Sequence, residues 1–265
     1  MFELVRSAHR RAQCSVSGVM MLLLCMLGCV SSESKLLTTA RQEAAEGRPE
    51  VAVGYYTEFL KLEPASIPAL LERGAILSQR RSTEDAAIAD FERVLELDYE
   101  QPAARRSLLD LYLARGDADR AEIVLKDLGS ELTPNETLFR QAQLALLQKE
   151  PAAAVKALTE LLRDETASTR ASVWYLRGLA RLKREDYRNA EIDLTQAIQR
   201  EPGNAQAFWQ RSLAMKQLGE AAAAENDRVQ AIQLDPRLGM AESATGKATV
   251  ETLQGSDFIT IQSSK

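Results

Sequence analysis

Residues 174–202 read WYLRGLARLKREDYRNAEIDLTQAIQREP, and this stretch decides the fold class. Its apolar residues recur every three or four positions, as they do on one face of an α-helix. In the first half, Trp174 is followed four residues later by the small Gly178, and in the second half Ala190 begins another apolar series. Pro202 closes the stretch, because proline cannot continue a helix. The stretch therefore predicts two helices that pack closely where the glycine lies.

The same pattern recurs along the chain, which indicates internal repeats. The second helix of each repeat is marked by an alanine, at intervals of 33 to 36 residues: Ala52, Ala87, Ala121, Ala154, Ala190 and Ala224. Glycines at Gly47, Gly116 and Gly219 mark turns between the two helices. The pattern has departures: Arg105 occupies a large apolar position, and Arg228 another apolar position.

This pattern resembles the tetratricopeptide repeat (TPR). The resemblance covers residues 34–236 in six units. It implies an all-α fold, a right-handed superhelical solenoid of about six helix-turn-helix units whose concave groove binds other proteins. After the repeats, residues 237–265 are expected to form a capping helix and a mobile tail.

The N-terminal residues are expected to form a targeting signal. Residues 1–28 contain a basic leader and a short apolar run that ends in Met26-Leu27-Gly28, directly before Cys29. They resemble a bacterial lipoprotein signal peptide, which implies that Cys29 is lipidated and that residues 29–33 form a short stalk. An uncleaved signal anchor and a chance cysteine in an ordinary signal peptide are the alternatives.

The composition argues against an enzyme. The single histidine, His9, and all three cysteines lie within the first 29 residues. Residues beyond Cys29 therefore cannot use an imidazole or a thiol for catalysis, nor build a Cys/His zinc site. Acidic and basic residues are interspersed, with a formal net charge of −5, which does not suit a nucleic-acid-binding surface. We expect no enzymatic activity, cofactor, metal or nucleic-acid partner.

The most specific functional prediction is an aromatic ladder. In the TPR family, the residue after the large apolar residue of the first helix points into the groove, and here this position holds Phe139, Tyr175 and Trp209. The complete predicted groove is Phe139, Gln143, Leu146, Tyr175, Leu179, Leu182, Trp209, Leu213 and Lys216. Partly exposed aromatic residues are common anchors of protein recognition. The alternatives are that the rings complete the core between repeats, or that the chain's own C-terminal segment occupies the groove.

Together these features predict a lipid-anchored scaffold or adaptor that binds an envelope protein through its groove. It would aid assembly or regulation of an envelope complex, with a pilus or secretin system slightly favoured by analogy. The expected location is the bacterial outer membrane, facing the periplasm. The alternative is an envelope receptor for a glycan or another small ligand that uses the same groove.

Overall fold

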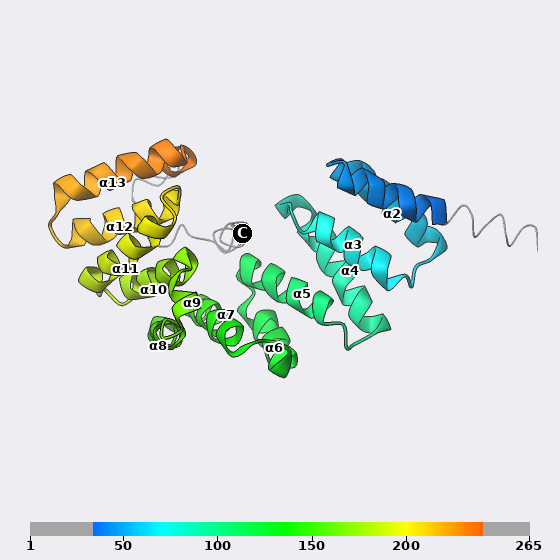
Figure 1. Cartoon of the computed structure of the whole chain (residues 1–265), viewed down its shortest axis with the longest axis horizontal. Coiled ribbons are helices and arrows are strands. Elements are labelled where there is room, and N and C mark those ends of the chain that lie inside the picture. The colour runs from blue at the N-terminus through cyan, green and yellow to red at the C-terminus, as the bar shows by residue number, and fades with distance from the viewer. Residues whose placement is uncertain (1–33, 241–265) are drawn as a thin grey trace, which may run out of the picture. The chain divides into compact units, whose positions relative to one another are not determined.

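The computed structural model describes residues 34–240 (Figure 1), and these residues are helical without a β-strand. The predicted all-α fold is confirmed. The chain divides into two compact units, residues 1–104 and 105–265. The predicted signal peptide, the lipidated Cys29 and most of the predicted cap and tail lie outside the described residues. Residues 237–240 are helical.

The N-terminal unit contains two helix pairs. A helix over residues 34–45 precedes α2 (Pro49–Leu62), and α3 (Ile67–Leu77) precedes α4 (Glu84–Leu97). Between α3 and α4 the chain forms a 3-10 turn, η1 (Arg81–Thr83).

The C-terminal unit begins within α5 and continues the alternation of first and second helices. Its elements are α5 (Pro102–Arg115), α6 (Ala118–Leu128), η2 (Gly129–Glu131), α7 (Pro134–Leu147), α8 (Pro151–Leu161), α9 (Glu165–Ser168), α10 (Ala171–Lys183), α11 (Tyr187–Arg200), α12 (Ala205–Gln217) and α13 (Ala221–Leu234). The pairs α7–α8, α10–α11 and α12–α13 each pack together, and α11 also packs against α12. The short helix α9 is an insertion between two pairs.

Small residues allow the two helices of a pair to approach closely. The six alanines that mark the repeats all lie on second helices and are buried. On the first helices, a Cβ added to Gly178 would lie 2.8 Å from Cγ of Leu194, and one added to Gly74 would lie 2.9 Å from the Phe91 ring. Real Cβ atoms essentially never come so close, so both glycines are required by packing.

In every described helix pair except α3–α4, the turn between the two helices contains one residue in the left-handed region. Gly47, Gly116 and Gly219 adopt it, with φ angles of 75°, 76° and 81°. In two other pairs the same position holds Lys149 and Glu185, with φ angles of 60° and 61°. A residue with a Cβ is strained in this conformation. The turn geometry is therefore kept even where the sequence contains no glycine.

The inserted helix α9 is capped by Asp164. Its carboxylate accepts hydrogen bonds from the backbone N–H of Thr166 at 2.7 Å and from the side-chain amide of Asn135 at 2.9 Å. Hydrogen bonds from Thr166 and Asn135 lower the pKa of Asp164 to about 2, because they stabilise its charged form. Since Asn135 lies at the start of α7, Asp164 links the insertion to the preceding pair.

A three-residue polar clamp recurs between consecutive pairs. In α10, the guanidinium of Arg177 donates to both carboxylate oxygens of Asp193 at 2.8 and 2.9 Å, and to the Thr159 hydroxyl at 3.4 Å. Asp193 lies on α11 of the same pair, whereas Thr159 lies on α8 of the preceding pair. The same clamp is formed by Arg211, Asp227 and Thr195, and in the N-terminal unit by Arg73, Asp90 and Thr57. Each arginine thus connects three helices.

Candidate protein-binding surface

The three rings of the predicted ladder lie on the first helices α7, α10 and α12, but they are buried. Phe139 is 5% exposed, Tyr175 2% and Trp209 5%. Phe139 and Tyr175 belong to the buried cluster that also contains Leu158 of α8 and Leu194 of α11. The expectation that the rings are exposed is therefore wrong, because side-chain packing in these units encloses the position after the large apolar residue.

The large apolar residues that precede the rings are less buried than the rings. Trp174 and Phe208 are only half-buried and pack against the edge of the core. Arg177 and Arg200 each place a guanidinium about 5.0 Å from the centre of the Trp174 ring, and the indole N–H donates to the Ser168 carbonyl at 2.8 Å. Trp174 can lie near solvent because cations cover its faces and its polar atom has a partner.

The other predicted groove residues follow the rings. Gln143, Leu146, Leu179 and Leu182 are buried, whereas Leu213 is half-buried and Lys216 is exposed. The structure therefore brings the predicted residues onto α7, α10 and α12 as expected, but an external partner can reach chiefly the last two. The role of the nine residues in binding stays a prediction.

A buried amide also lies on α12, and no pattern in the sequence indicates it. Gln210 of α12 is 0% exposed, and neither its amide nitrogen nor its amide oxygen has a hydrogen-bond partner. Gln143 differs, because its oxygen accepts a hydrogen bond from Arg140 at 3.1 Å. A buried amide without a partner costs about 1–3 kcal/mol of stability, so Gln210 requires an explanation.

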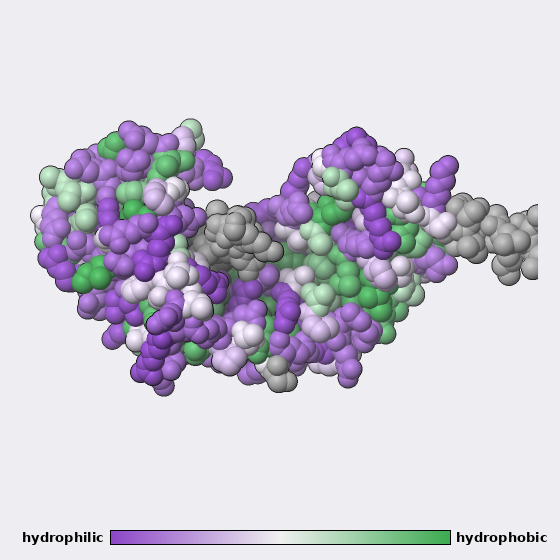
Figure 2. Space-filling model, viewed as in Figure 1, coloured by the Kyte–Doolittle hydropathy of each residue, from purple (hydrophilic) through white to green (hydrophobic). Residues whose placement is uncertain are grey.

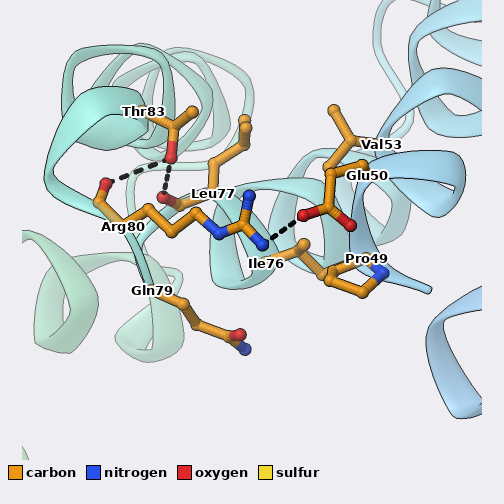
Figure 3. Close-up of a pocket in the computed structure, with 8 residues that line it drawn as sticks. All are labelled: Pro49, Glu50, Val53, Ile76, Leu77, Gln79, Arg80 and Thr83. Atoms are coloured by element: carbon orange, nitrogen blue, oxygen red, sulfur yellow. Dashed lines mark hydrogen bonds and ion pairs between the residues drawn. The ribbon is translucent and has the colours of Figure 1, made fainter. Parts of the chain in front are cut away.

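The N-terminal unit has a different surface. Figure 2 shows a broad apolar area over α3 and α4, and Ile67, Leu71, Ile76 and Leu77 of α3 are half-buried. Beside it lies a pocket of about 170 Å³ (Figure 3), lined by Pro49, Glu50, Val53, Ile76, Leu77, Gln79, Arg80 and Thr83. Ligand pockets usually have about 300–1,000 Å³, so this one suits a single side chain.

An ion pair crosses this pocket. The Arg80 guanidinium extends to the Glu50 carboxylate, while the Thr83 hydroxyl donates to the Leu77 carbonyl at 2.5 Å (Figure 3). The Arg80 and Glu50 side chains are both largely exposed, and such surface pairs contribute little to stability. The pocket can therefore open at little cost. No sequence motif indicated it, because its lining comes from two helices and a turn.

The N-terminal unit also contains a titratable cluster that serves packing. Arg41 donates to both carboxylate oxygens of Glu72, and the Tyr56 hydroxyl donates to one of them at 2.8 Å. Burial alone would raise the pKa of Glu72, but hydrogen bonds from Arg41 and Tyr56 outweigh it and lower the pKa. Because Glu72 is held in its charged form by these partners, it is unsuited to act as a general acid.

Residues 34–240 contain neither a metal-binding cluster nor a membrane-spanning helix. No group of three or more histidine, cysteine, aspartate or glutamate side chains in this range could hold a metal ion. No helix in the described part of the chain is both long enough and apolar enough to span a membrane.

Comparison with protein families identifies the repeats. Two tetratricopeptide repeat models match this chain, at residues 85–129 and 171–204. The chain contains tetratricopeptide repeats. The first match spans three helices, α4 to α6, and the second spans the pair α10–α11. A search of curated proteins finds no match.

Several solved structures share the TPR fold at low sequence identity. A tetratricopeptide repeat protein from Parabacteroides merdae is 15% identical with a TM-score of 0.64, covering 87% of this chain and 98% of its own. PilW, described as a type IV pilus biogenesis factor, is 15% identical with a TM-score of 0.62, covering 77% and 93%. PilF of Pseudomonas aeruginosa is 17% identical with a TM-score of 0.59, covering 83% and 100%. At these identities the comparisons show the fold alone.

The TPR fold is typical of scaffolds that bind other proteins. In this chain, the described residues present two surfaces of different character. One is the side of α7, α10 and α12 that carries the nine predicted groove residues, which we call the ladder face and whose aromatic rings are buried. The other is the open apolar area and pocket of the N-terminal unit. The apolar area of the N-terminal unit suits contact with another protein, because its side chains are partly accessible.

Proposed function

We propose that this TPR protein is a lipid-anchored adaptor of the bacterial envelope, which binds a segment of an envelope protein through the ladder face. The observation that carries the proposal is the stack of TPR helix pairs, whose first helices bring bulky apolar side chains from three repeats onto one face. Stacked repeats create extended surfaces on which a helix or an extended peptide can lie.

The proposed anchor is Cys29. Supporting it, the apolar run and Gly28 stand directly before this cysteine, and Ser31 and Ser32 follow without an aspartate next to the cysteine. A lipid anchor would confine the protein to a membrane surface and raise its effective concentration near a membrane-bound partner. We place it in the outer membrane, with the repeats facing the periplasm.

We favour assembly of a pilus or secretin complex as the pathway. PilW is described as a pilus biogenesis factor and shares the TPR fold over most of its length. This support is a likeness of fold, and function depends on the site and not on the fold alone. A glycan or small-ligand receptor is less well supported, because the pocket beside α2 and α3 is small and no aromatic side chain lines it.

The test uses the accessible end of the ladder face. The full chain is used to capture partners from detergent-solubilised envelopes, beside a Leu213→Glu/Lys216→Glu variant and an Ile192→Glu control. Ile192 is exposed on α11, away from the first helices. We expect one envelope protein to be retained by the original chain and the control. Its affinity for the double variant should fall at least about tenfold, since contact residues at binding hot spots contribute about 2 kcal/mol or more.

Equal retention by all three chains would show that this face does not bind the partner. Retention of no envelope protein by the original chain would overturn the adaptor function. The anchor is tested separately with Cys29→Ser, which should lose metabolic incorporation of palmitate and be released from membranes. A Cys29→Ser chain that still carries palmitate would contradict the proposed anchor.

A further inference from the structure

The pocket of the N-terminal unit lies in the seam between two helix pairs. Its lining comes from the first turns of α2, from the end of α3 and from the turn that continues to Thr83 (Figure 3). Nearer the middle of the same helices, the clamp arginine Arg73 donates to Thr57 of α2 and to Asp90 of α4. The pocket is therefore the part of the seam that the clamp does not close.

One residue distinguishes this seam from the two seams of the C-terminal unit that contain a clamp. The residue three positions after the clamp arginine is Ile76 in α3, Ala180 in α10 and Ala214 in α12. Both alanines are fully buried, whereas Ile76 is half-buried and lines the pocket. The position that the helices enclose in the other two seams is thus accessible to a ligand in the N-terminal unit.

The pocket has the size of one apolar side chain. Its volume is about 170 Å³, and a cavity of ~150 Å³ lined by apolar side chains can bind benzene. Its apolar lining residues are Pro49, Val53, Ile76 and Leu77. The Thr83 hydroxyl donates to the Leu77 carbonyl, so it requires no partner from a ligand. The pocket therefore suits a phenyl ring or a branched aliphatic side chain.

The two charged residues of the pocket differ in their partners. The Glu50 carboxylate accepts a hydrogen bond from its own backbone N–H and pairs with Arg80, and both interactions lower its pKa. The Arg80 guanidinium offers five N–H donors, and Glu50 is the acceptor that the structure describes for it. If a ligand carboxylate took Arg80, Glu50 would keep its backbone N–H and its favourable place in the first turn of α2. The pocket is therefore better suited to an acidic ligand than to a basic one.

We infer that this pocket is a second binding site, which takes one apolar side chain of a partner peptide that carries an acidic residue beside it. A phenylalanine or leucine side chain would lie against Val53 and Ile76, as apolar anchors do in protein interfaces. The neighbouring carboxylate would pair with Arg80 in place of Glu50. The site shares no residue with the ladder face of α7, α10 and α12, so it goes beyond the proposed function and does not depend on it.

The experiment titrates the isotope-labelled full chain in detergent with short peptides and follows its backbone amides by NMR. The probe is acetyl-Gly-Glu-Phe-Gly-amide. Two further peptides replace its glutamate by glutamine or its phenylalanine by alanine. We expect the probe to cause saturable shifts within residues 49–83, and the alanine peptide to cause none. The glutamine peptide should bind about twofold to fivefold more weakly, which is the effect of one exposed ion pair.

Three variants locate the binding. Val53→Trp fills the pocket and should abolish the saturable shifts. Val51→Trp is the matched control on the same helix, because Val51 is exposed and does not line the pocket, and it should bind the probe as the original chain does. Arg80→Ser changes a largely exposed side chain and should bind the glutamate and glutamine peptides equally. Circular dichroism checks that each variant is folded, and Arg80→Ser keeps the test decisive if Val53→Trp is not.

The absence of saturable shifts in the original chain would overturn the inference, as would binding that persists in folded Val53→Trp. Equal affinity of the original chain for the glutamate and glutamine peptides would refute the preference for an acidic partner. Shifts within residues 49–83 that depend on protein concentration without any peptide would overturn the inference in favour of a second copy of the chain. None of these measurements involves the ladder face, so they are distinguishable from a failure of the adaptor function.

Discussion

The pairs α10–α11 and α12–α13 differ from α5–α6 in how they fill one internal position. In the first two pairs, a partly buried arginine and a buried aspartate face each other, Arg177 with Asp193 and Arg211 with Asp227. In α5–α6, the corresponding residues are Leu108, which is buried, and Val124, which is half-buried. The same helix-pair geometry therefore accepts either a hydrogen-bonded ion pair or two apolar side chains.

The comparison predicts a large effect when one partner is removed. Asp227→Ala leaves Arg211 partly buried without its counter-charge, so we expect the free energy of unfolding to fall by about 3–5 kcal/mol. The measurement is urea unfolding followed by circular dichroism. As the control, Arg211→Leu/Asp227→Val reproduces the apolar solution of α5–α6 and should change stability by less than about 1.5 kcal/mol. A double variant as unstable as the single one would show that the two solutions are not equivalent.

A smaller effect is expected where the pairs depend on close approach. Gly178→Ala places a Cβ 2.8 Å from Leu194 of α11, and we expect a loss of about 1–3 kcal/mol from the forced displacement. Gly203→Ala is the matched control, because a Cβ there would meet nothing within 4 Å. Both are measured by thermal unfolding. A loss no larger in Gly178→Ala than in the control would mean that α10 and α11 separate without cost.

The smallest effect concerns the turns. Glu185 adopts φ 61° between α10 and α11, where Gly116 adopts φ 76° between α5 and α6. Glu185→Gly should raise the free energy of unfolding by about 0.5–1 kcal/mol, since glycine relieves the left-handed strain but loses more chain entropy. Gly116→Ala should lower it by a similar amount. Stability that falls in Glu185→Gly would indicate that the Glu185 side chain makes a compensating contact.

The fold could be predicted because the residues that recur in each repeat are those that the packing of its two helices requires. The six repeat alanines and Gly178 must be small because the two helices of each pair lie close together. All seven residues are buried, as this close packing requires. The turn residues were only partly predictable. A left-handed conformation could be predicted at Gly47, Gly116 and Gly219, because glycine favours it. Nothing in the sequence predicts the same conformation at Lys149 and Glu185.

The candidate site was harder to predict, because burial depends on neighbours that are distant in sequence. Trp174 and Tyr175 are adjacent, and either could face inward by helical periodicity. The structure buries Tyr175 and leaves Trp174 half-buried under Arg177 and Arg200, the latter from the following helix of the pair. The clamps could have been noticed, since Asp90, Asp193 and Asp227 all stand three residues after a repeat alanine.

The sequence by itself thus determined the helix pairs, their repeat and the lack of histidine and cysteine chemistry beyond Cys29, because these follow from periodicity and residue type. Only the tertiary structure decided which rings are enclosed, which charges are paired and that Gln210 is buried without a partner. The physical reason is that periodicity specifies one face of a helix, whereas a helix in a stack has several neighbours. Which of them covers a given side chain depends on packing between repeats.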